Sequence, residues 1–257
     1  MCRLTAYVGA PAPVAPLVYG GNHPLLRQSW APQELLSGSV NADGWGVVWM
    51  EQGRLLRLSA GTPLWQAHDL EPVLQTRAAP AALAALRNIT DGVPLGPDGT
   101  PPLLRAGHAF VLNGFLGGYR QRLRRLLAPL SDETLSLLQG TTDTELLFLN
   151  VLERVRRGAS PPDALADVVD TSIAATAADG EEAQIVCAWL TPTGVLHGAR
   201  ASSTDACNSL YAVEGGTLAP EGVLIASERL DTDPGWAPVP SGSVFTLDAQ
   251  GLRARPL

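Results

Sequence analysis

The second residue of the chain is a cysteine whose position would let it act as a nucleophile. Methionine aminopeptidases remove Met1 when the next side chain is small, and this would leave Cys2 with a thiol and a free α-amine on one residue. An α-amino group titrates near pH ~8, so close to neutrality it can accept the thiol proton and return it to a leaving amine. That arrangement is typical of an N-terminal nucleophile. A small buried residue at the start of a strand would look the same, so other residues must decide between the two interpretations.

Three further segments carry polar groups where a predicted strand gives way to a turn. They are Asn41-Ala-Asp-Gly-Trp-Gly46, Arg87-Asn-Ile-Thr90 and Asn113-Gly114. The last offers an amide side chain and a backbone N–H on a flexible residue, which are the parts of an oxyanion hole. An arginine can hold a carboxylate through paired hydrogen bonds, and an aspartate at a predicted helix start, Asp143, can bind an ammonium group. Together these groups would hold the α-carboxylate and α-amine of a glutamyl group.

The order of these motifs resembles that of the class II glutamine amidotransferases. The resemblance rests on the opening Cys2-Arg3, the Asn-Ala-Asp-Gly-Trp-Gly segment, the Arg-x-x-Thr, the Asn-Gly and the Thr-Asp-Thr-Glu145. It implies an α+β fold, the four-layer αββα sandwich of N-terminal nucleophile hydrolases, with Cys2 as nucleophile and its own amine as base. The site residues implied are Asn113 and Gly114 for the oxyanion hole, Arg87 and Thr90 for the glutamyl carboxylate, Asp143 for its amine, and Asp43 and Gly44 as residues that shape the pocket.

Two positions depart from the family pattern. Leu112 stands where a histidine usually precedes the Asn-Gly pair, and Asn88 and Ile89 interrupt the common Arg-x-Ala-Thr. Neither change removes a residue to which the resemblance assigns a role.

Within this family the chain is most similar to the amidohydrolases of ergothioneine biosynthesis. The similarity rests on four further segments: Gln28-Ser-Trp-Ala-Pro32, Ala226-Ser-Glu228, Asp231-Thr-Asp-Pro-Gly-Trp236 and Ser209-Leu-Tyr211. It implies hydrolysis of a γ-glutamyl amide through a Cys2 acyl-enzyme, with release of glutamate and no metal or organic cofactor. In such substrates the half of the molecule that leaves as the amine, here called the departing half, is a cysteine sulfoxide joined to a trimethylated histidine. That cation would suit the aromatic faces of Trp30, Trp45 or Tyr211, and the segment Arg200-Ala-Ser-Ser203 would touch the same half.

Two alternatives remain open. The chain could be a glutaminase subunit that supplies ammonia to a separate synthetase, or an inactive member that binds a ligand or partner. The complete set of predicted site residues argues against inactivity. The chain length leaves no room for a fused synthetase domain, which favours a hydrolase acting alone on a small-molecule γ-glutamyl substrate.

Composition excludes several classes of function. All 18 basic residues are arginine, so chemistry that requires a lysine ε-amine, such as a Schiff base to pyridoxal phosphate, is excluded. The net charge of −7 disfavours a nucleic-acid partner. The basic cluster Arg120, Arg122, Arg124 and Arg125 lies among leucines, which indicates the solvated face of an amphipathic helix.

Cysteine and histidine positions point to a reducing compartment. Cys2, Cys187 and Cys207 show no Cys-x-x-Cys spacing, and the four histidines are scattered, so neither a disulfide framework nor a metal site is predicted. Prolines interrupt the apolar N-terminal stretch, and no run approaches a membrane-spanning length. We therefore expect a cytoplasmic protein without a membrane partner.

The hydrophobic content of 46% and the length of 257 residues predict one globular domain over residues 2–257. Strands are expected at 4–9, 46–50, 54–58, 78–87, 108–112, 183–190, 194–199, 210–213, 223–226 and 244–247, and helices at 70–77, 115–127, 131–139, 143–157 and 161–178. The strand at 78–87 is predicted against the helix propensity of its alanines, because Pro80 would interrupt a helix. Strands, then helices, then strands indicate two sheets with helices layered on them.

Overall fold

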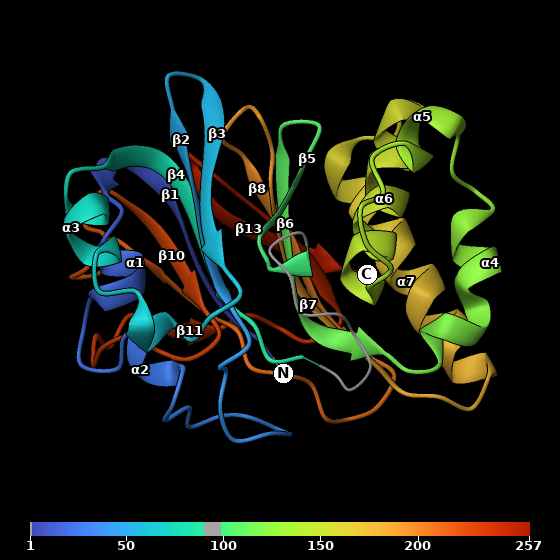
Figure 1. The fold of residues 1–257 in the computed structure, drawn as a ribbon, viewed down its shortest axis with the longest axis horizontal. Coiled ribbons are helices and arrows are strands. Elements are labelled where there is room, and N and C mark those ends of the chain that lie inside the picture. The colour runs from blue at the N-terminus through green and yellow to red at the C-terminus, as the bar shows by residue number, and fades with distance from the viewer. Residues whose placement is uncertain (1, 90–98) are drawn as a thin grey trace.

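Two stacked antiparallel sheets form the centre of the protein, as shown by a computed structural model that describes residues 2–89 and 99–257 (Figure 1). The first sheet has the strand order β11-β9-β10-β1-β4-β2-β3 and the second the order β13-β12-β8-β7-β6-β5. In the first sheet the strands are β1 (Arg3–Pro13), β2 (Trp45–Glu51), β3 (Arg54–Ala60), β4 (Ala78–Leu86), β9 (Tyr211–Glu214), β10 (Gly222–Ala226) and β11 (Ala237–Pro238). In the second they are β5 (Leu103–Arg105), β6 (His108–Leu116), β7 (Ala183–Leu190), β8 (Leu196–Ser202), β12 (Ser243–Asp248) and β13 (Gly251–Pro256).

Helices cover the outer face of each sheet. The short helices α1 (Pro16–Tyr19), α2 (Leu25–Gln28) and α3 (Leu70–Gln75) share a hydrophobic cluster with the first sheet. The long helices α6 (Asp143–Arg156) and α7 (Pro161–Ala178) share another with the second sheet. A third cluster, which includes Leu4, Val48, Val111 and Val186, fills the space between the sheets. The layers are therefore helix, sheet, sheet, helix, as the αββα expectation requires.

Strand β4 forms despite its alanine-rich sequence because it is buried on both faces. Ala82 and Ala84 face the first helical layer, whereas Ala81, Leu83 and Ala85 face the second sheet. Small side chains here let the layers approach closely, and burial outweighs the intrinsic preference of alanine for helix. The strand ends at Leu86, directly before Arg87, so the packing of β4 positions this predicted site residue.

The predicted hairpin at residues 46–58 is confirmed by β2 and β3. Gln52 and Gly53 both have positive φ angles, 51° and 74°, which match the twist that a two-residue hairpin requires. The helix expected at 143–157 is confirmed as α6, where the Thr142 side chain accepts a hydrogen bond from the N–H of Glu145 at 3.2 Å. Gly158 follows the helix with a φ of 96°.

Three local expectations were wrong. Phe115 and Leu116 continue strand β6, so helical structure begins only at a 3-10 turn (Tyr119–Arg122) and α4 (Leu123–Leu127). The helix expected at 131–139 is reduced to α5 (Asp132–Leu135). Arg122 is not on a solvated face: it is buried, donates to the carbonyl of Gly117 and lies 3.5 Å from a carboxylate oxygen of Asp179.

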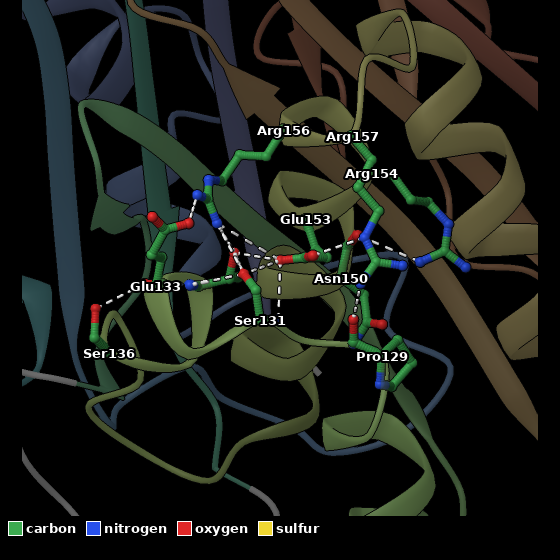
Figure 2. A network of polar contacts seen from close by, with 10 residues as sticks. Pro129, Ser131, Glu133, Ser136, Asn150, Glu153, Arg154, Arg156 and Arg157 are labelled. Atoms are coloured by element: carbon green, nitrogen blue, oxygen red, sulfur yellow. Dashed lines mark hydrogen bonds and ion pairs between the residues drawn. The ribbon is translucent and has the colours of Figure 1, made fainter.

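A buried carboxylate joins α5 to α6 (Figure 2). Oε2 of Glu153 accepts hydrogen bonds from the Thr134 hydroxyl at 2.5 Å, the Ser131 hydroxyl at 2.8 Å and the Ser131 N–H at 3.2 Å. Arg157 Nε donates to the other oxygen at 2.8 Å. These donors, the Thr134 hydroxyl above all, lower the pKa of Glu153 to about 2. The network therefore fixes the position of α6, the helix whose first turn carries Asp143.

Across residues 2–89 and 99–257, no helix combines the length and the hydropathy needed to cross a bilayer.

Candidate active site

Cys2 lies at the wall of a small cavity of about 80 Å³. The cavity also contacts Arg87 and Asn88 from the end of β4, Gly114 of β6, and Asp143 at the start of α6. Four segments that are far apart in sequence therefore meet around the thiol. Of the predicted site residues, Cys2, Arg87, Gly114 and Asp143 line this cavity.

The surroundings of Cys2 act on its thiol in opposite directions. Burial raises the pKa of Cys2, and the Asp143 carboxylate adds to this effect. A hydrogen bond from the Asn88 backbone N–H and the positive charge of Arg87 oppose it. A thiol with a raised pKa needs an adjacent base to become a nucleophile, which is the task that the α-amine of Cys2 would perform.

Arg87 is buried and is supported by the predicted Asp43-Gly44 pair. The Asp43 N–H donates to the Arg87 carbonyl at 3.1 Å, and the Arg87 N–H donates to the Gly44 carbonyl at 2.8 Å. Asp43 Oδ2 accepts from the Ile89 N–H at 2.7 Å. Asp43 and Gly44 are not among the residues that line the cavity, so they shape it by holding the 87–89 segment. Thr90, predicted to help hold the glutamyl carboxylate, lies outside the described residues.

Asp143 is the first residue of α6, and its carboxylate is held by two backbone donors. Oδ2 accepts from the Leu116 N–H at 3.0 Å and Oδ1 from the Thr144 N–H at 2.7 Å. Burial raises the pKa of Asp143, and these hydrogen bonds act against that rise. The helix start is fixed in turn by Glu145, which pairs with the buried Arg105 at 2.6 Å. A carboxylate held this firmly can receive an ammonium group without rearrangement.

The geometry of β6 indicates where the N–H of Gly114 points. In an antiparallel strand, alternate N–H groups point toward and away from the neighbouring strand. Leu116 directs its N–H to Asp143, whereas Gly117 donates to the carbonyl of Glu182, on the β7 side. Gly114 lies two residues before Leu116, so its N–H points to the same side of the strand as the Leu116 N–H. That side faces away from β7 and toward the cavity. A side chain here is excluded, because a Cβ would lie 1.9 Å from the Gln184 carbonyl oxygen.

Asn113 is fully buried and does not line the cavity. Its Nδ2 lies 3.4 Å from the Ser227 hydroxyl, and its Oδ1 has no hydrogen-bond partner among the described residues. Ser227 Oγ also accepts from the Leu4 N–H at 3.0 Å. Rotating the Asn113 amide would let the Ser227 hydroxyl donate to Oδ1 and would release Nδ2 for another acceptor. Ser227 thus joins the strand that follows Cys2 to the strand that carries Asn113.

A buried ion pair behind the nucleophile had no role assigned from the sequence. Arg3 Nε donates to Glu228 at 2.8 Å, and Arg3 Nη1 donates to the Cys2 carbonyl at 3.1 Å. Glu228 also contacts His23 Nε2 at 2.7 Å and accepts from the N–H groups of Gln33 and Glu34. Arg3 and Glu228 both belong to motifs on which the family resemblance rests. Their place in those motifs was the sequence signal that could have identified them as functional residues.

A second, larger cavity of about 590 Å³ adjoins the first. Six residues line both: Asn88, Ile89, Gly114, Tyr119, Arg120 and Asp143. Sequence reasoning missed Tyr119 and Arg120, because it placed both in a helix over 115–127 and assigned Arg120 to the solvated face of that helix.

The aromatic residues and the 200–203 segment expected to face the departing half do not line either cavity. Trp45 is buried in the core, Trp30 packs edge-to-face against Trp65, and the Tyr211 ring is covered by the guanidinium of Arg229 at 4.7 Å. Arg200 donates to the carbonyls of Asn208 and Val239. Within the described part of the chain, no three His, Cys, Asp or Glu side chains are grouped so that they could hold a metal ion.

Comparison with known proteins gives similar sequences and similar folds. No protein-family model matches the chain. The γ-glutamyl-hercynylcysteine sulfoxide hydrolase of Mycolicibacterium smegmatis is 28% identical, over 93% of this chain and 92% of that protein. The hydrolase of the same name from Mycobacterium tuberculosis is 26% identical, over 98% and 95%. The probable glutamine amidotransferase DUG3 of Saccharomyces cerevisiae is 25% identical, over all of this chain and 84% of that protein.

Among solved structures, a glutamine aminotransferase class-II domain protein from Silicibacter pomeroyi matches with a TM-score of 0.71 and 20% identity over 99% of both chains. Glutamine phosphoribosylpyrophosphate amidotransferase from B. subtilis matches with a TM-score of 0.70 and 17% identity, over 99% of this chain and 49% of that one.

Proposed function

Because the chain has the fold of the class II glutamine amidotransferases, and its curated relatives are hydrolases or amidotransferases, we propose that it hydrolyses a γ-glutamyl amide through Cys2. The observation that carries the proposal is the convergence of Cys2, Arg87, Gly114 and Asp143 on one small cavity. Arg87 binds the α-carboxylate of the glutamyl group and Asp143 its α-ammonium. The two charges fix the γ-carbonyl carbon beside the thiol.

Acylation uses the groups that surround the thiol. The free α-amine of Cys2 accepts the thiol proton, and Sγ attacks the γ-carbonyl carbon. The Gly114 N–H and the Asn113 amide donate to the oxygen that becomes negative. When the tetrahedral intermediate collapses, the C–N bond breaks, and the departing nitrogen takes the proton from the α-ammonium of Cys2. The products of this step are a thioester on Cys2 and a free amine.

Deacylation repeats the same proton transfers with water. The Cys2 amine removes a proton from a water molecule as the water oxygen attacks the thioester carbonyl. The thiolate leaves and recovers the proton, and glutamate is released. One residue thus provides both the nucleophile and the base, and the chain's other site residues provide binding and oxyanion stabilisation.

For the substrate we propose γ-glutamyl-hercynylcysteine sulfoxide or a closely related compound. The support is the full-length similarity to hydrolases of that name, together with an outer cavity of about 590 Å³ beside the glutamyl pocket. Ammonia, the departing group of glutamine, needs no such space. Free glutamine, and with it the role of an ammonia-supplying subunit, is the second candidate, and it is favoured by the similarity to the yeast amidotransferase.

The decisive experiment combines mass spectrometry with kinetics. Intact-mass measurement of active protein should show a chain that begins at Cys2, and Cys2→Ala should abolish glutamate release. Cys207→Ala is the matched control, because Cys207 is a free, partly exposed thiol that does not line either cavity, and it should keep full activity. Active protein that retains Met1 would refute the mechanism. Values of kcat/KM for the sulfoxide and for glutamine then distinguish the two candidate substrates.

A further inference from the structure

Cys2 directly precedes strand β1, which begins at Arg3, so its orientation depends on how its own main chain is held. On the proposed function, removal of Met1 leaves Cys2 joined to the chain on one side only. The thiol and the α-amine are then carried by the same Cα. Rotation about the bond from this Cα to the carbonyl carbon turns both groups relative to the carbonyl. The contact that holds the Cys2 carbonyl therefore aims the nucleophile and its base together.

The Cys2 carbonyl is held by the side chain of Arg3. In an antiparallel strand, carbonyls of residues two apart point to the same side. The Leu4 carbonyl accepts from the Ser227 N–H at 2.9 Å, so an extended chain directs the Cys2 carbonyl to that side as well. Strand β10 has already ended there, at Ala226. Arg3 Nη1 donates to the carbonyl at 3.1 Å, in place of a neighbouring strand.

The guanidinium of Arg3 is held in turn by Glu228. Arg3 is completely buried, and its Nε donates to Oε1 of Glu228 at 2.8 Å. The same oxygen accepts from the Glu34 N–H at 3.1 Å, whereas Oε2 accepts from the Gln33 N–H at 2.9 Å and from His23 Nε2 at 2.7 Å. Burial raises the pKa of Glu228, but these donors and the charge of Arg3 bring it below its ordinary value. An ionised carboxylate therefore fixes the guanidinium whose Nη1 reaches the nucleophile.

This ion pair lies outside the cavities that would receive substrate. Neither Arg3 nor Glu228 lines either of them. Glu228 instead borders a separate polar cavity of about 410 Å³, which shares no described lining residue with those two. A buried ion pair also adds little to stability, because the cost of desolvating two charges offsets their attraction. The contact with the Cys2 carbonyl gives the pair a role that neither substrate binding nor stability supplies.

We propose that Arg3 and Glu228 are positioning residues that hold Cys2 with its thiol and α-amine directed at the scissile amide. This assignment rests on the proposed function and goes beyond it, because it adds two residues that act on the rate without touching the substrate. Both Nε and Nη1 of Arg3 are needed, since one reaches the carboxylate and the other the carbonyl. A lysine at this position keeps the charge and loses that planar geometry.

The test compares Arg3→Lys and Glu228→Gln with wild type in the release of glutamate from whichever candidate substrate the wild type hydrolyses. Both variants should lower kcat by at least about tenfold and change KM by less than about twofold, because Arg87 and Asp143 still bind the glutamyl group. In Glu228→Gln, the NH₂ group replaces one oxygen and so faces two of the four donors. Urea denaturation of the same preparations measures their stability.

Arg105→Lys is the matched control, because it makes the same substitution in another buried arginine–glutamate pair. The partner of Arg105 is Glu145, which supports the start of α6. An effect of this variant on catalysis should therefore fall on KM, through Asp143, and leave kcat within about twofold of wild type.

The outcomes separate the positioning role from the proposed function. An unchanged kcat in Arg3→Lys and Glu228→Gln, a loss that appears in KM, or an equal fall of kcat in Arg105→Lys overturns the positioning role and leaves γ-glutamyl hydrolysis intact. Loss of folding in both Arg3→Lys and Glu228→Gln also overturns it, because the pair would then serve stability alone. Absence of glutamate release by wild type from both candidate substrates would instead overturn the proposed function.

Discussion

Replacing Glu153 with glutamine should cost the protein roughly 2–3 kcal/mol of stability at pH 7. The carboxylate is buried, and one oxygen accepts three hydrogen bonds, from Thr134 and from the hydroxyl and N–H of Ser131. These contacts lower its pKa from 4.5 to about 2. At about 1.4 kcal/mol per pKa unit, the difference corresponds to roughly 3 kcal/mol. A glutamine amide keeps one acceptor, so its NH₂ group would confront the donors or leave them without a partner.

The sign of the pH dependence follows from the lowered pKa. The contribution of the Glu153 carboxylate to the free energy of unfolding is complete above pH 4.5 and is lost as the pH falls toward 2. One unit below the unfolded value, near pH ~3.5, about 1.4 kcal/mol is already gone. Urea denaturation of wild type and Glu153→Gln between pH ~7 and ~3.5 measures both quantities. The gap between the two proteins should shrink as the pH falls.

The exposed partner of this network provides the control. The Glu133 side chain is 75% exposed and pairs with Arg156, so Glu133→Gln should cost less than about 1 kcal/mol. Because Glu153 lies at the far end of α6 from Asp143, folded Glu153→Gln should bind γ-glutamyl substrate with an unchanged KM. Equal urea midpoints for wild type and Glu153→Gln at pH ~7, or parallel pH profiles, would show that the carboxylate does not hold the helices in this way.

Three further predictions concern the cavity. Asp143→Asn should lower the pKa of the Cys2 thiol and Arg87→Gln should raise it, because the two charges act on the thiol with opposite signs. Rates of iodoacetamide alkylation against pH measure this, and shifts of the same sign in both variants would contradict it. The same two variants should raise KM for γ-glutamyl substrates by about tenfold or more while kcat changes less, since they bind groups whose charge is constant during acyl transfer. If the Ser227 hydroxyl orients the Asn113 amide for the oxyanion, Ser227→Ala should lower kcat by about tenfold at a constant KM, and Ser227→Thr should recover most of the lost kcat. Steady-state kinetics measure both variants, and an effect confined to KM would exclude that role.

The strand pattern was predictable where burial and turn chemistry agree. The hairpin around Gln52-Gly53 and the α6 helix with its Thr142 cap have local signals, and both are confirmed. The end of β6 has none, because Phe115 and Leu116 fit a helix or a strand equally well. Pairing with β7 decides the matter, and a single sequence does not contain that information.

The residues of the candidate site likewise divide into those that the sequence predicted and those that it did not. Cys2, Arg87, Gly114 and Asp143 were named from motifs, and the structure brings them to one cavity. The place of Arg120 in the wall of the outer cavity was not foreseen, because Arg120 belongs to a run of arginines and leucines that is typical of an ordinary amphipathic helix. Only the turn at Gly118, which ends the strand and redirects the chain, places that arginine at the site.

Strand β1 is the fourth of seven strands in its sheet, and it pairs with β4 on one side and β10 on the other. Cys2 directly precedes it, and the Leu4 N–H is bonded to Ser227. Displacing the nucleophile therefore means breaking the middle of the sheet, and amide hydrogens at Leu4 and Thr5 should exchange with solvent only through global opening. The 3-10 turn Tyr119–Arg122 has no such anchorage in a sheet. Because this turn lines the outer cavity, substitutions in it can change that cavity without disturbing the aim of the thiol.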